Sequence, residues 1–258
     1  MKDITITNKI LNWYDINKRV LPWRKKVSYK KKQYYTLVSE FMLQQTQVAT
    51  VIPYFTRFIK YIPDLETLAS FENHKLIKLW EGLGYYSRVI NLKKTAKLVI
   101  KKFDKKIPTN YLDLKSLPGI GDYTASAILA IVFNKPIIPL DGNIERVLKR
   151  YLYLKKENEI KKENLNGRKS IFGYSNRASD YAQALMELGA LICKPNNPEC
   201  KKCPISNKCI ALKKKDFLLT KIKKKNNDKY YLLKVYKDKS KYLLIKNTKF
   251  NFLKNFSI

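Results

Sequence analysis

The sequence predicts an all-α fold, and three observations support this prediction. Apolar residues recur at helical spacing from Tyr34 to Ile62, and strand-like alternation is scarce before residue 228. The 258 residues include only eight glycines and ten prolines, which argues against a turn-rich sandwich or barrel. An apolar content of 45% is ordinary for a folded protein. We therefore expect a helical body with a sizeable core.

The expected helices follow one another along the body with short loops between them. Within the apolar stretch 34–62, Pro53 should mark a helix boundary or the first turn of a new helix. Further helical stretches are expected at residues 75–82, 86–103, 123–133, 143–153 and 178–193.

Beyond Cys209 the composition changes. Residues 211–258 hold 15 lysines and three aspartates, a local excess of 12 positive charges. We expect residues 221–228 to form a linker. The following YYLLKVYKDKSKYLLIKN predicts two strands around the polar turn 237–240. An isolated hairpin is marginal in water, so it should pack on the body or stay loosely ordered.

The chain carries 53 basic and 21 acidic residues, a formal net charge of +32. Such an excess attracts phosphate backbones and speeds encounter with nucleic acid. Because 45 of the basic residues are lysine, beside many isoleucines, asparagines and tyrosines, an AT-rich genome explains the excess equally well. Charge alone therefore identifies no reaction.

The N-terminal segment has no long apolar core, and no stretch approaches the roughly 18 apolar residues of a membrane span. We expect a cytoplasmic monomer without membrane contact, associated with the nucleoid if bacterial. Its four cysteines should then be thiols rather than disulfides. The single histidine, His74, lies in a polar segment and is expected at the surface.

Those cysteines, Cys193, Cys200, Cys203 and Cys209, lie within 17 residues of each other. Four thiolates in so short a segment can surround one ion or cluster, because thiolate sulfur is a soft ligand. Structural zinc uses the same four ligands, and the remaining interpretation is that the four cysteines form two disulfides. The spacing predicts a metal centre without choosing iron over zinc.

The segment LPGIGDYTA predicts a tight turn followed by a helix start. Gly119 and Gly121 permit the turn and the close approach of another backbone. Free N–H groups at the start of the helix can bind a DNA phosphate without reading sequence. An ordinary corner between two helices gives the same pattern.

Two acidic residues lie in segments of unusual composition. Glu40 precedes the polar cluster QQTQ in SEFMLQQTQV, although most helical glutamates merely face water. Asp141 opens LDGNIER, where it can simply cap the following helix.

Taken together, SEFMLQQTQV, GLGYYSR, LPGIGDYTA, LDGN and the four cysteines closely resemble the adenine DNA glycosylase (MutY) family of the endonuclease III superfamily, in both order and spacing. The resemblance covers about residues 8–212. It implies removal of adenine from A:8-oxoguanine or A:G mispairs in double-stranded DNA by hydrolysis to an abasic site. It also implies a 4Fe–4S cluster on Cys193, Cys200, Cys203 and Cys209.

The resemblance assigns catalytic roles to four residues. Glu40 is the acid toward adenine N7, with a pKa raised by desolvation. Asp141 stabilises the charge that develops at C1′, Asn143 orients Asp141, and Tyr123 touches the reacting centre.

Further residues are implied in adenine and DNA binding. The adenine pocket is lined by Trp23, Arg24, Leu43, Val48 and Gln183. Tyr85 wedges into the base stack, with Tyr86 as the neighbouring candidate, and Gln45 helps to fill or read the vacated space. Thr46, Gly119 and Gly121 complete the DNA-binding set. The assignment of the pocket is loosened by a loop at residues 25–32 that is longer than the family's.

Strand-cleaving relatives carry a lysine where this chain has Tyr123, so the resemblance implies a predominantly monofunctional glycosylase. The alternatives are a bifunctional glycosylase like endonuclease III, which Tyr123 and QQTQV oppose, and a noncatalytic DNA-binding relict, which the intact Glu40 and Asp141 oppose.

The implied architecture has two helical lobes around a DNA cleft. Residues 1–27 and 137–212 form the cluster lobe, and residues 28–136 form the lobe with the helix-hairpin-helix. Residues 213–258 are expected to be a basic linker and a truncated, Nudix-like remnant with a short β-hairpin. We expect this shorter C-terminus to weaken the preference for 8-oxoguanine over guanine.

Overall fold

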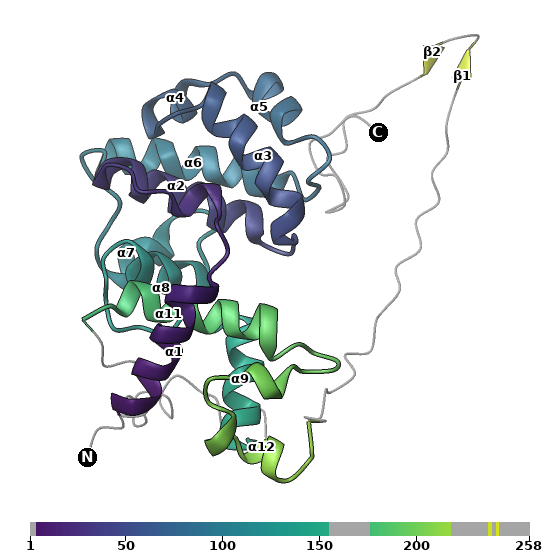
Figure 1. The fold of residues 1–258 in the computed structure, drawn as a ribbon. Coiled ribbons are helices and arrows are strands. Elements are labelled where there is room, and N and C mark those ends of the chain that lie inside the picture. The colour runs from purple at the N-terminus through teal and green to yellow at the C-terminus, as the bar shows by residue number, and fades with distance from the viewer. Residues whose placement is uncertain (1–3, 155–175, 218–236, 239–240, 243–258) are drawn as a thin grey trace. The chain divides into compact units, whose positions relative to one another are not determined.

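The computed structural model describes residues 4–154, 176–217, 237–238 and 241–242. It divides into two compact units, residues 1–220 and 221–258. The described part of the first unit is built from helices, which confirms the all-α prediction (Figure 1). None of the described helices is long and apolar enough to cross a membrane.

The α-helices of the first unit are α1 (Ile4–Asn17), α2 (Tyr29–Leu43), α3 (Val48–Tyr61), α4 (Leu65–Ser70), α5 (Asn73–Trp80), α6 (Ser87–Lys102), α7 (Tyr111–Ser116), α8 (Asp122–Ile131), α9 (Gly142–Leu152), α11 (Ala178–Glu187) and α12 (Ile210–Lys213). A π-helical turn, Leu188–Ile192, continues α11. Short 3-10 turns lie at Pro22–Arg24, Cys200–Lys202 and Ser206–Lys208.

Several helices begin at a polar side chain that accepts a hydrogen bond from a free backbone N–H. Asp64 caps α4 in this way through Thr67, Asn110 caps α7, and Asp141 caps α9. Asp141 therefore does perform the capping role that its sequence context suggested.

A first cluster of buried apolar side chains lies between Tyr34 and Val132 and joins α2 to α8. Helix α2 is central to it, because Leu37, Val38, Phe41 and Met42 are all fully buried. This helix packs on α3, α6 and α8. Since each buried aliphatic or aromatic side chain stabilises the fold by roughly 2 kcal/mol, this burial fixes the C-terminal end of α2.

A second cluster joins α1, α9, α11 and the segment that reaches Ile205. In Figure 1 these helices lie below the group formed by α2 to α6, and α11 also packs on α8. The two clusters draw on separate parts of the chain. Because residues 1–220 form one compact unit, the lobe boundaries at residues 27, 136 and 212 stay a prediction.

Two details differ from the sequence-based expectation. Pro53 marks no boundary but lies inside α3, and its missing N–H is tolerated because Val51, Phe55 and Phe58 bury one face of that helix. The loop expected at 25–32 is also shorter, because Ser28 caps α2 and the helix begins at Tyr29.

The second unit is described only at two short strands. β1 (Lys237–Asp238) and β2 (Lys241–Tyr242) are antiparallel, with Lys237 opposite Tyr242 and Asp238 opposite Lys241. The hairpin is thus present, but its strands include part of the expected turn 237–240. The expected linker 221–228 and the rest of the predicted remnant 229–258 lie outside the described residues.

Candidate active site and cysteine pocket

Glu40 lies near the C-terminal end of α2, and its side chain is almost completely buried, with 4% exposed. Tyr123, the second residue of α8, forms a hydrogen bond with its carboxyl group. The carboxyl oxygen Oε2 is buried and has no hydrogen-bond partner in the described part of the chain. Burial raises the pKa of Glu40 to about 7. The hydrogen bond with Tyr123 and the charge of Arg24 lower this pKa, whereas the charge of Asp141 raises it further. Glu40 can therefore hold a proton near neutral pH.

Asp141 stands at the N-terminus of α9 with both carboxyl oxygens bonded. The backbone N–H of Ile144 donates to Oδ1 at 2.7 Å, and Asn143 Nδ2 donates to Oδ2 at 3.1 Å. Burial raises the pKa of Asp141, and these bonds oppose the rise. The positive end of the α9 dipole adds further support to the anion.

The three groups Glu40, Tyr123 and Asp141 share one buried site. The charges of both carboxyl groups act on Tyr123, and together with burial they raise its pKa well above the usual range. Glu40 lies on α2, Tyr123 on α8, and Asp141 caps α9. Glu40 and Tyr123 are separated by 83 positions in the sequence and Tyr123 and Asp141 by 18, so only folding brings the three together. The arrangement offers one acid and one stabilised carboxylate, which is the pair that glycosidic cleavage needs.

The five residues expected in an adenine pocket lie around the end of α2 and on α11. Trp23 packs edge-on against Phe55, with ring centres 5.4 Å apart. Leu43 lies half-buried against the first core, and Val48 is half-buried at the start of α3. The charge of Arg24 reaches both Glu40 and Tyr123. Gln183 is buried, and its amide donates within its own helix to Ser179; no hydrogen bond joins it to Glu40 among the described residues.

Glu187 escaped the sequence analysis. It is fully buried, and it accepts hydrogen bonds from Arg19 at 2.7 and 2.9 Å and from Arg24 at 2.9 Å. An acidic residue inside the apolar run AQALMELGAL was the available signal, because a buried charge requires partners. Glu187 thereby fixes the arginine that lies beside Glu40.

Two loops carry the residues expected to enter DNA. We call residues 44–47, between α2 and α3, the glutamine loop, and residues 81–86, between α5 and α6, the tyrosine loop. Gln45 and Tyr85 are both exposed, while Thr46 and Tyr86 are half-buried. Gln45 and Tyr85 have positive φ angles of 57° and 47°, a conformation that non-glycine residues seldom adopt.

The turn between α7 and α8 adopts the predicted helix-hairpin-helix shape. Gly119 has a φ of +80°, and a Cβ there would approach Phe41 to 2.7 Å, so the position requires glycine. Gly121 needs no such freedom, because its φ is −88° and a Cβ would meet nothing within 4 Å. The expected tight turn is thus found at Gly119, but the groups that approach it are the side chains of Phe41 and Asn91 rather than another backbone, and nothing approaches Gly121 closely. Gln44 of the glutamine loop donates to the Gly119 carbonyl at 3.1 Å.

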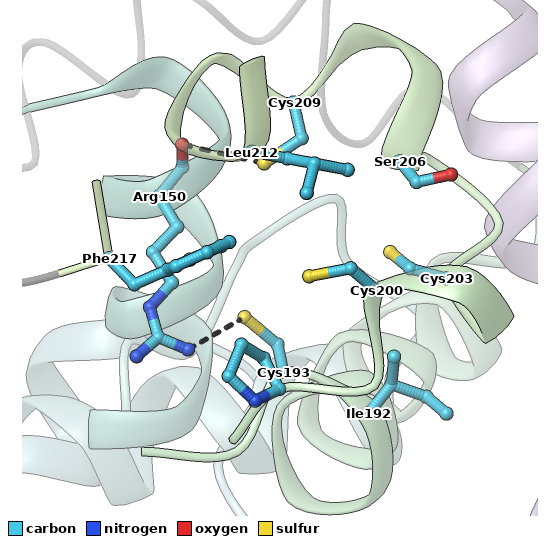
Figure 2. A pocket seen from close by; sticks show the side chains of 10 residues that line it. Arg150, Ile192, Cys193, Cys200, Cys203, Ser206, Cys209, Leu212 and Phe217 are labelled. Carbon is cyan, nitrogen blue, oxygen red and sulfur yellow. Dashed lines mark hydrogen bonds between the residues drawn. The ribbon is translucent and has the colours of Figure 1, made fainter. Parts of the chain in front are cut away.

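All four cysteines line one pocket, which Figure 2 shows from close by. The rest of the lining is mainly apolar and includes Ile192, Leu212 and Phe217, with Arg150 as its one charged residue. Among the described residues, no group of three or more His, Cys, Asp or Glu side chains is arranged around a single metal ion.

Two arginines connect α9 with the cysteine segment. Arg150 lies beside the Cys193 sulfur, with Nη1 at 3.5 Å, and its backbone carbonyl lies 3.7 Å from the Cys209 sulfur. Arg146 donates to the Cys193 carbonyl at 2.7 Å and to Asn143 at 2.8 Å. Burial raises the pKa of Cys203 to about 12, so a bound cation is needed to hold this sulfur as a thiolate.

Comparison with known proteins identifies the family of this chain. The family model of the "HhH-GPD superfamily base excision DNA repair protein" matches residues 38–169. The adenine DNA glycosylase of Buchnera aphidicola subsp. Schizaphis graminum is 40% identical over 253 residues, 95% of this chain and 72% of the relative. The Homo sapiens adenine DNA glycosylase is also 40% identical, over 78% of this chain and 38% of its own length.

A solved structure has the same fold. The structure of a thermostable thymine-DNA glycosylase aligns with a TM-score of 0.70 and 26% identity, covering 83% of this chain and 97% of its own. The chain thus shares its fold with a DNA glycosylase of known structure. By sequence and by fold, the chain belongs to the HhH-GPD superfamily of base excision DNA repair proteins and, within it, to the adenine DNA glycosylases.

Proposed function

We propose that this chain hydrolyses the N-glycosidic bond of adenine mispaired with 8-oxoguanine or guanine in double-stranded DNA, acting as a monomer. The observation that carries the proposal is the Oε2 atom of Glu40, which is buried, has no partner and belongs to a group with a pKa of about 7. A buried polar atom without a partner is costly, and a substrate atom that accepts its proton removes that cost.

In the proposed reaction Glu40 is the general acid. Its carboxyl proton moves to N7 of the everted adenine as the bond between N9 and C1′ breaks, so that the base leaves without a negative charge. The Tyr123 bond holds the carboxyl group while Oε2 faces the base. Proton transfer by a positioned side chain contributes roughly 10²- to 10⁴-fold to a rate.

Asp141 stabilises the positive charge that develops on the sugar. Its bonds from Ile144 and Asn143 favour the ionised form and fix its direction. Water then adds to C1′ and its proton passes to the Glu40 carboxylate, directly or through solvent, which restores the acid and leaves free adenine and an abasic site. In this reaction Asn143 positions Asp141, and Arg24 lies beside the acid.

The base must leave the duplex before it can react. We assign the wedge to Tyr85 and the vacated space to Gln45, because both side chains are exposed on their loops. Thr46 and Tyr86 support these loops. The turn at Gly119 and Gly121 offers the free N–H groups at the start of α8 to a phosphate of the DNA backbone. These contacts position the duplex and carry no sequence information.

The cysteine pocket fits a 4Fe–4S cluster. Four soft donors line one pocket, and Arg150 adds a positive charge beside them. Such a cluster would be held by Cys193, Cys200, Cys203 and Cys209 and would fix the segment that follows α11. Iron and acid-labile sulfide in the purified chain, about four of each, are the expected result, and zinc alone would contradict it.

We further propose that the enzyme is predominantly monofunctional. A Schiff base with C1′ requires an amine, and Tyr123 places a phenol beside the two carboxyl groups instead. Borohydride should therefore trap no covalent complex with DNA. Strand nicking as fast as base release would show that another group supplies the amine.

The decisive test compares release of adenine from an A:8-oxoguanine duplex by the wild type and by Glu40→Gln under single-turnover conditions. The variant should lose at least about 100-fold in rate while binding the same duplex. Glu72→Gln is the matched control, since Glu72 is exposed and paired with Lys75. If the cluster-loaded wild type releases no adenine, the noncatalytic relict becomes the better description.

A further inference from the structure

Arg88, the second residue of α6, is a buried arginine whose two terminal nitrogens lie within hydrogen-bond distance of six acceptors, which share their four hydrogens. Only 6% of the residue is exposed, and none of the six acceptors carries a formal charge. Burying a charge among neutral groups is costly, and Arg88 has no acidic partner among these acceptors. Ion pairing therefore does not explain this arrangement. The proposed reaction assigns no role to Arg88.

The two terminal nitrogens of Arg88 serve different loops. Nη1 donates to the end of α2 and to the glutamine loop, at the carbonyls of Met42 (2.7 Å) and Gln44 (2.6 Å) and the Thr46 hydroxyl (3.1 Å). Nη2 donates to the tyrosine loop, at the carbonyls of Leu83 (2.9 Å) and Gly84 (3.1 Å). One planar, rigid group therefore sets the separation of the two loops.

Both loops contain a backbone conformation that needs support. Gln45 and Tyr85, with their positive φ angles, lie directly beside residues that Arg88 binds. Such conformations persist only where the surroundings fix them, and they are frequent at functional sites. The Arg88 guanidinium also lies 5.7 Å from the centre of the Tyr85 ring, close enough for a cation–π attraction.

We propose that Arg88 is a positioning residue that couples the glutamine and tyrosine loops, so that Gln45 and Tyr85 enter the duplex together when adenine is everted. The inference rests on the proposed function and deepens it. In this proposal Arg88 controls the eversion step although it touches neither base nor sugar. Glu40 and Asp141 control cleavage of the bond.

Arg88→Lys is the informative substitution. Lysine keeps the charge and the alkyl stem, but its single ammonium cannot reach both loops as a fork does. Base release is measured under single-turnover conditions on two duplexes, one with adenine opposite 8-oxoguanine and one with adenine opposite an abasic-site analogue. In the second duplex the adenine has no partner base, so its eversion should depend less on the coupling of the two loops.

We expect Arg88→Lys to slow release from the paired duplex by roughly 10- to 100-fold and from the unpaired duplex by less than about threefold, since small errors of position cost that much. Equal losses on both duplexes, or no loss on either, would overturn the proposal. Arg57→Lys is the matched control, because Arg57 is also an arginine near a tyrosine ring but donates to the Leu79 carbonyl. It should leave both rates unchanged.

Hydrogen–deuterium exchange of the free protein gives a readout that needs no activity. Arg88→Lys should raise exchange in residues 44–47 and 83–86 together, with exchange in the centres of α2 and α6 unchanged. If exchange rises in only one loop, the loops are not coupled and the proposal fails. Thr46→Val, which removes one acceptor of Nη1, should give a smaller rise of the same kind if Arg88→Lys does not fold. Absence of base release by the wild type would reject the proposed function but not this coupling.

Discussion

Glu40 and Asp141 are both buried carboxyl groups, and their surroundings favour different protonation states. Asp141 accepts two hydrogen bonds and lies at a helix N-terminus. Glu40 lies close to the C-terminal end of α2, where the helix dipole disfavours an anion, and one of its oxygens has no partner. The difference lets one group donate a proton at the pH at which the other is a carboxylate.

Base release should therefore depend on pH in a defined direction. With a pKa of about 7, Glu40 loses its proton as the pH rises, and the rate should fall about tenfold per unit well above pH 7. At acidic pH the rate should fall again once Asp141 becomes protonated, since its pKa is raised. Single-turnover rates between pH 4.5 and 9 test this. A rate that stays level up to pH 9 would exclude Glu40 as the acid.

The same burial should make Glu40 a cost to stability. The pKa of Glu40 is about 7 in the folded chain, against an ordinary value of 4.5 that applies to the unfolded chain. The folded state therefore binds the proton more tightly than the unfolded state does. Stability should fall between pH 4.5 and 7, by at most about 3 kcal/mol. Glu40→Gln removes the charge, so its Tm should exceed that of the wild type by several degrees at pH 8 and by little at pH 5.

Glu72→Gln provides the matched control for that measurement. Lys75 lowers the pKa of Glu72, so this carboxylate favours folding once it is ionised, above its unfolded pKa. Its replacement should therefore give a small effect of the opposite sign. If Glu40→Gln and Glu72→Gln behave alike across the pH range, the cost assigned to Glu40 is wrong.

At the level of elements, a buried ion network joins the end of α11 to the segment that follows α1, beside the candidate active site. Glu187 at the end of α11 binds Arg19 and Arg24 from the segment after α1. Removal of one partner from a buried pair leaves the other charge uncompensated. Both arginines are partly exposed, at 33% and 17% of their side chains, so water reduces this penalty.

Glu187→Gln should consequently destabilise the chain by about 2 kcal/mol, measured by urea unfolding. It should also lower the pKa of Glu40, because Arg24 then acts without its counter-charge, and the alkaline limb of the rate profile should move to lower pH. Glu66→Gln is the control, since Glu66 pairs with the exposed Lys30 and should cost less than about 1 kcal/mol. An unchanged limb would show that Arg24 does not influence Glu40.

The contact between α9 and the turn after α11 gives a second test at this level. A Cβ at Gly189 would approach the Cβ of Asn143 to 2.6 Å, so Gly189→Ala must displace the residue that orients Asp141. We expect a loss of about 1 to 3 kcal/mol of stability together with slower base release. Gly142→Ala is the control for stability, because a Cβ there meets nothing within 4 Å. Equal stability of the two variants would contradict this account.

Much of this architecture could be predicted from the sequence. Helical spacing predicted the regions of α5, α6, α8, α9 and α11, since apolar periodicity reflects the buried face directly. Pro53 was misplaced because tertiary burial outweighs a local helix breaker. Arg88 was missed because most of its partners are backbone carbonyls, which leave no local pattern. Glu187 left a local signal, a charge inside an apolar run, but its arginine partners lie far away in the sequence.

Taken as a whole, the chain carries a net charge of +32, and lysines appear on most of the described elements, although α4, α8 and α11 have none. Some of them form exposed pairs, such as Lys75 with Glu72, which contribute little to stability. Repulsion among so many like charges disfavours a compact state unless a polyanion neutralises them. The charge therefore has a physical consequence whether it arose from genome composition or from selection for DNA binding.

Salt dependence of DNA binding separates these two origins. If the lysines contact the backbone, each neutralised phosphate lowers the slope of log K against log salt by about 0.9, and about six contacts give a slope near −5. Binding of Glu40→Gln to duplexes with and without a mispair, between about 50 and 200 mM salt, measures this without base release. The two duplexes should share one slope and differ by a constant, because phosphate contacts carry no sequence information. A slope near zero would mean that the lysines face solvent in the complex, and would assign their abundance to composition alone.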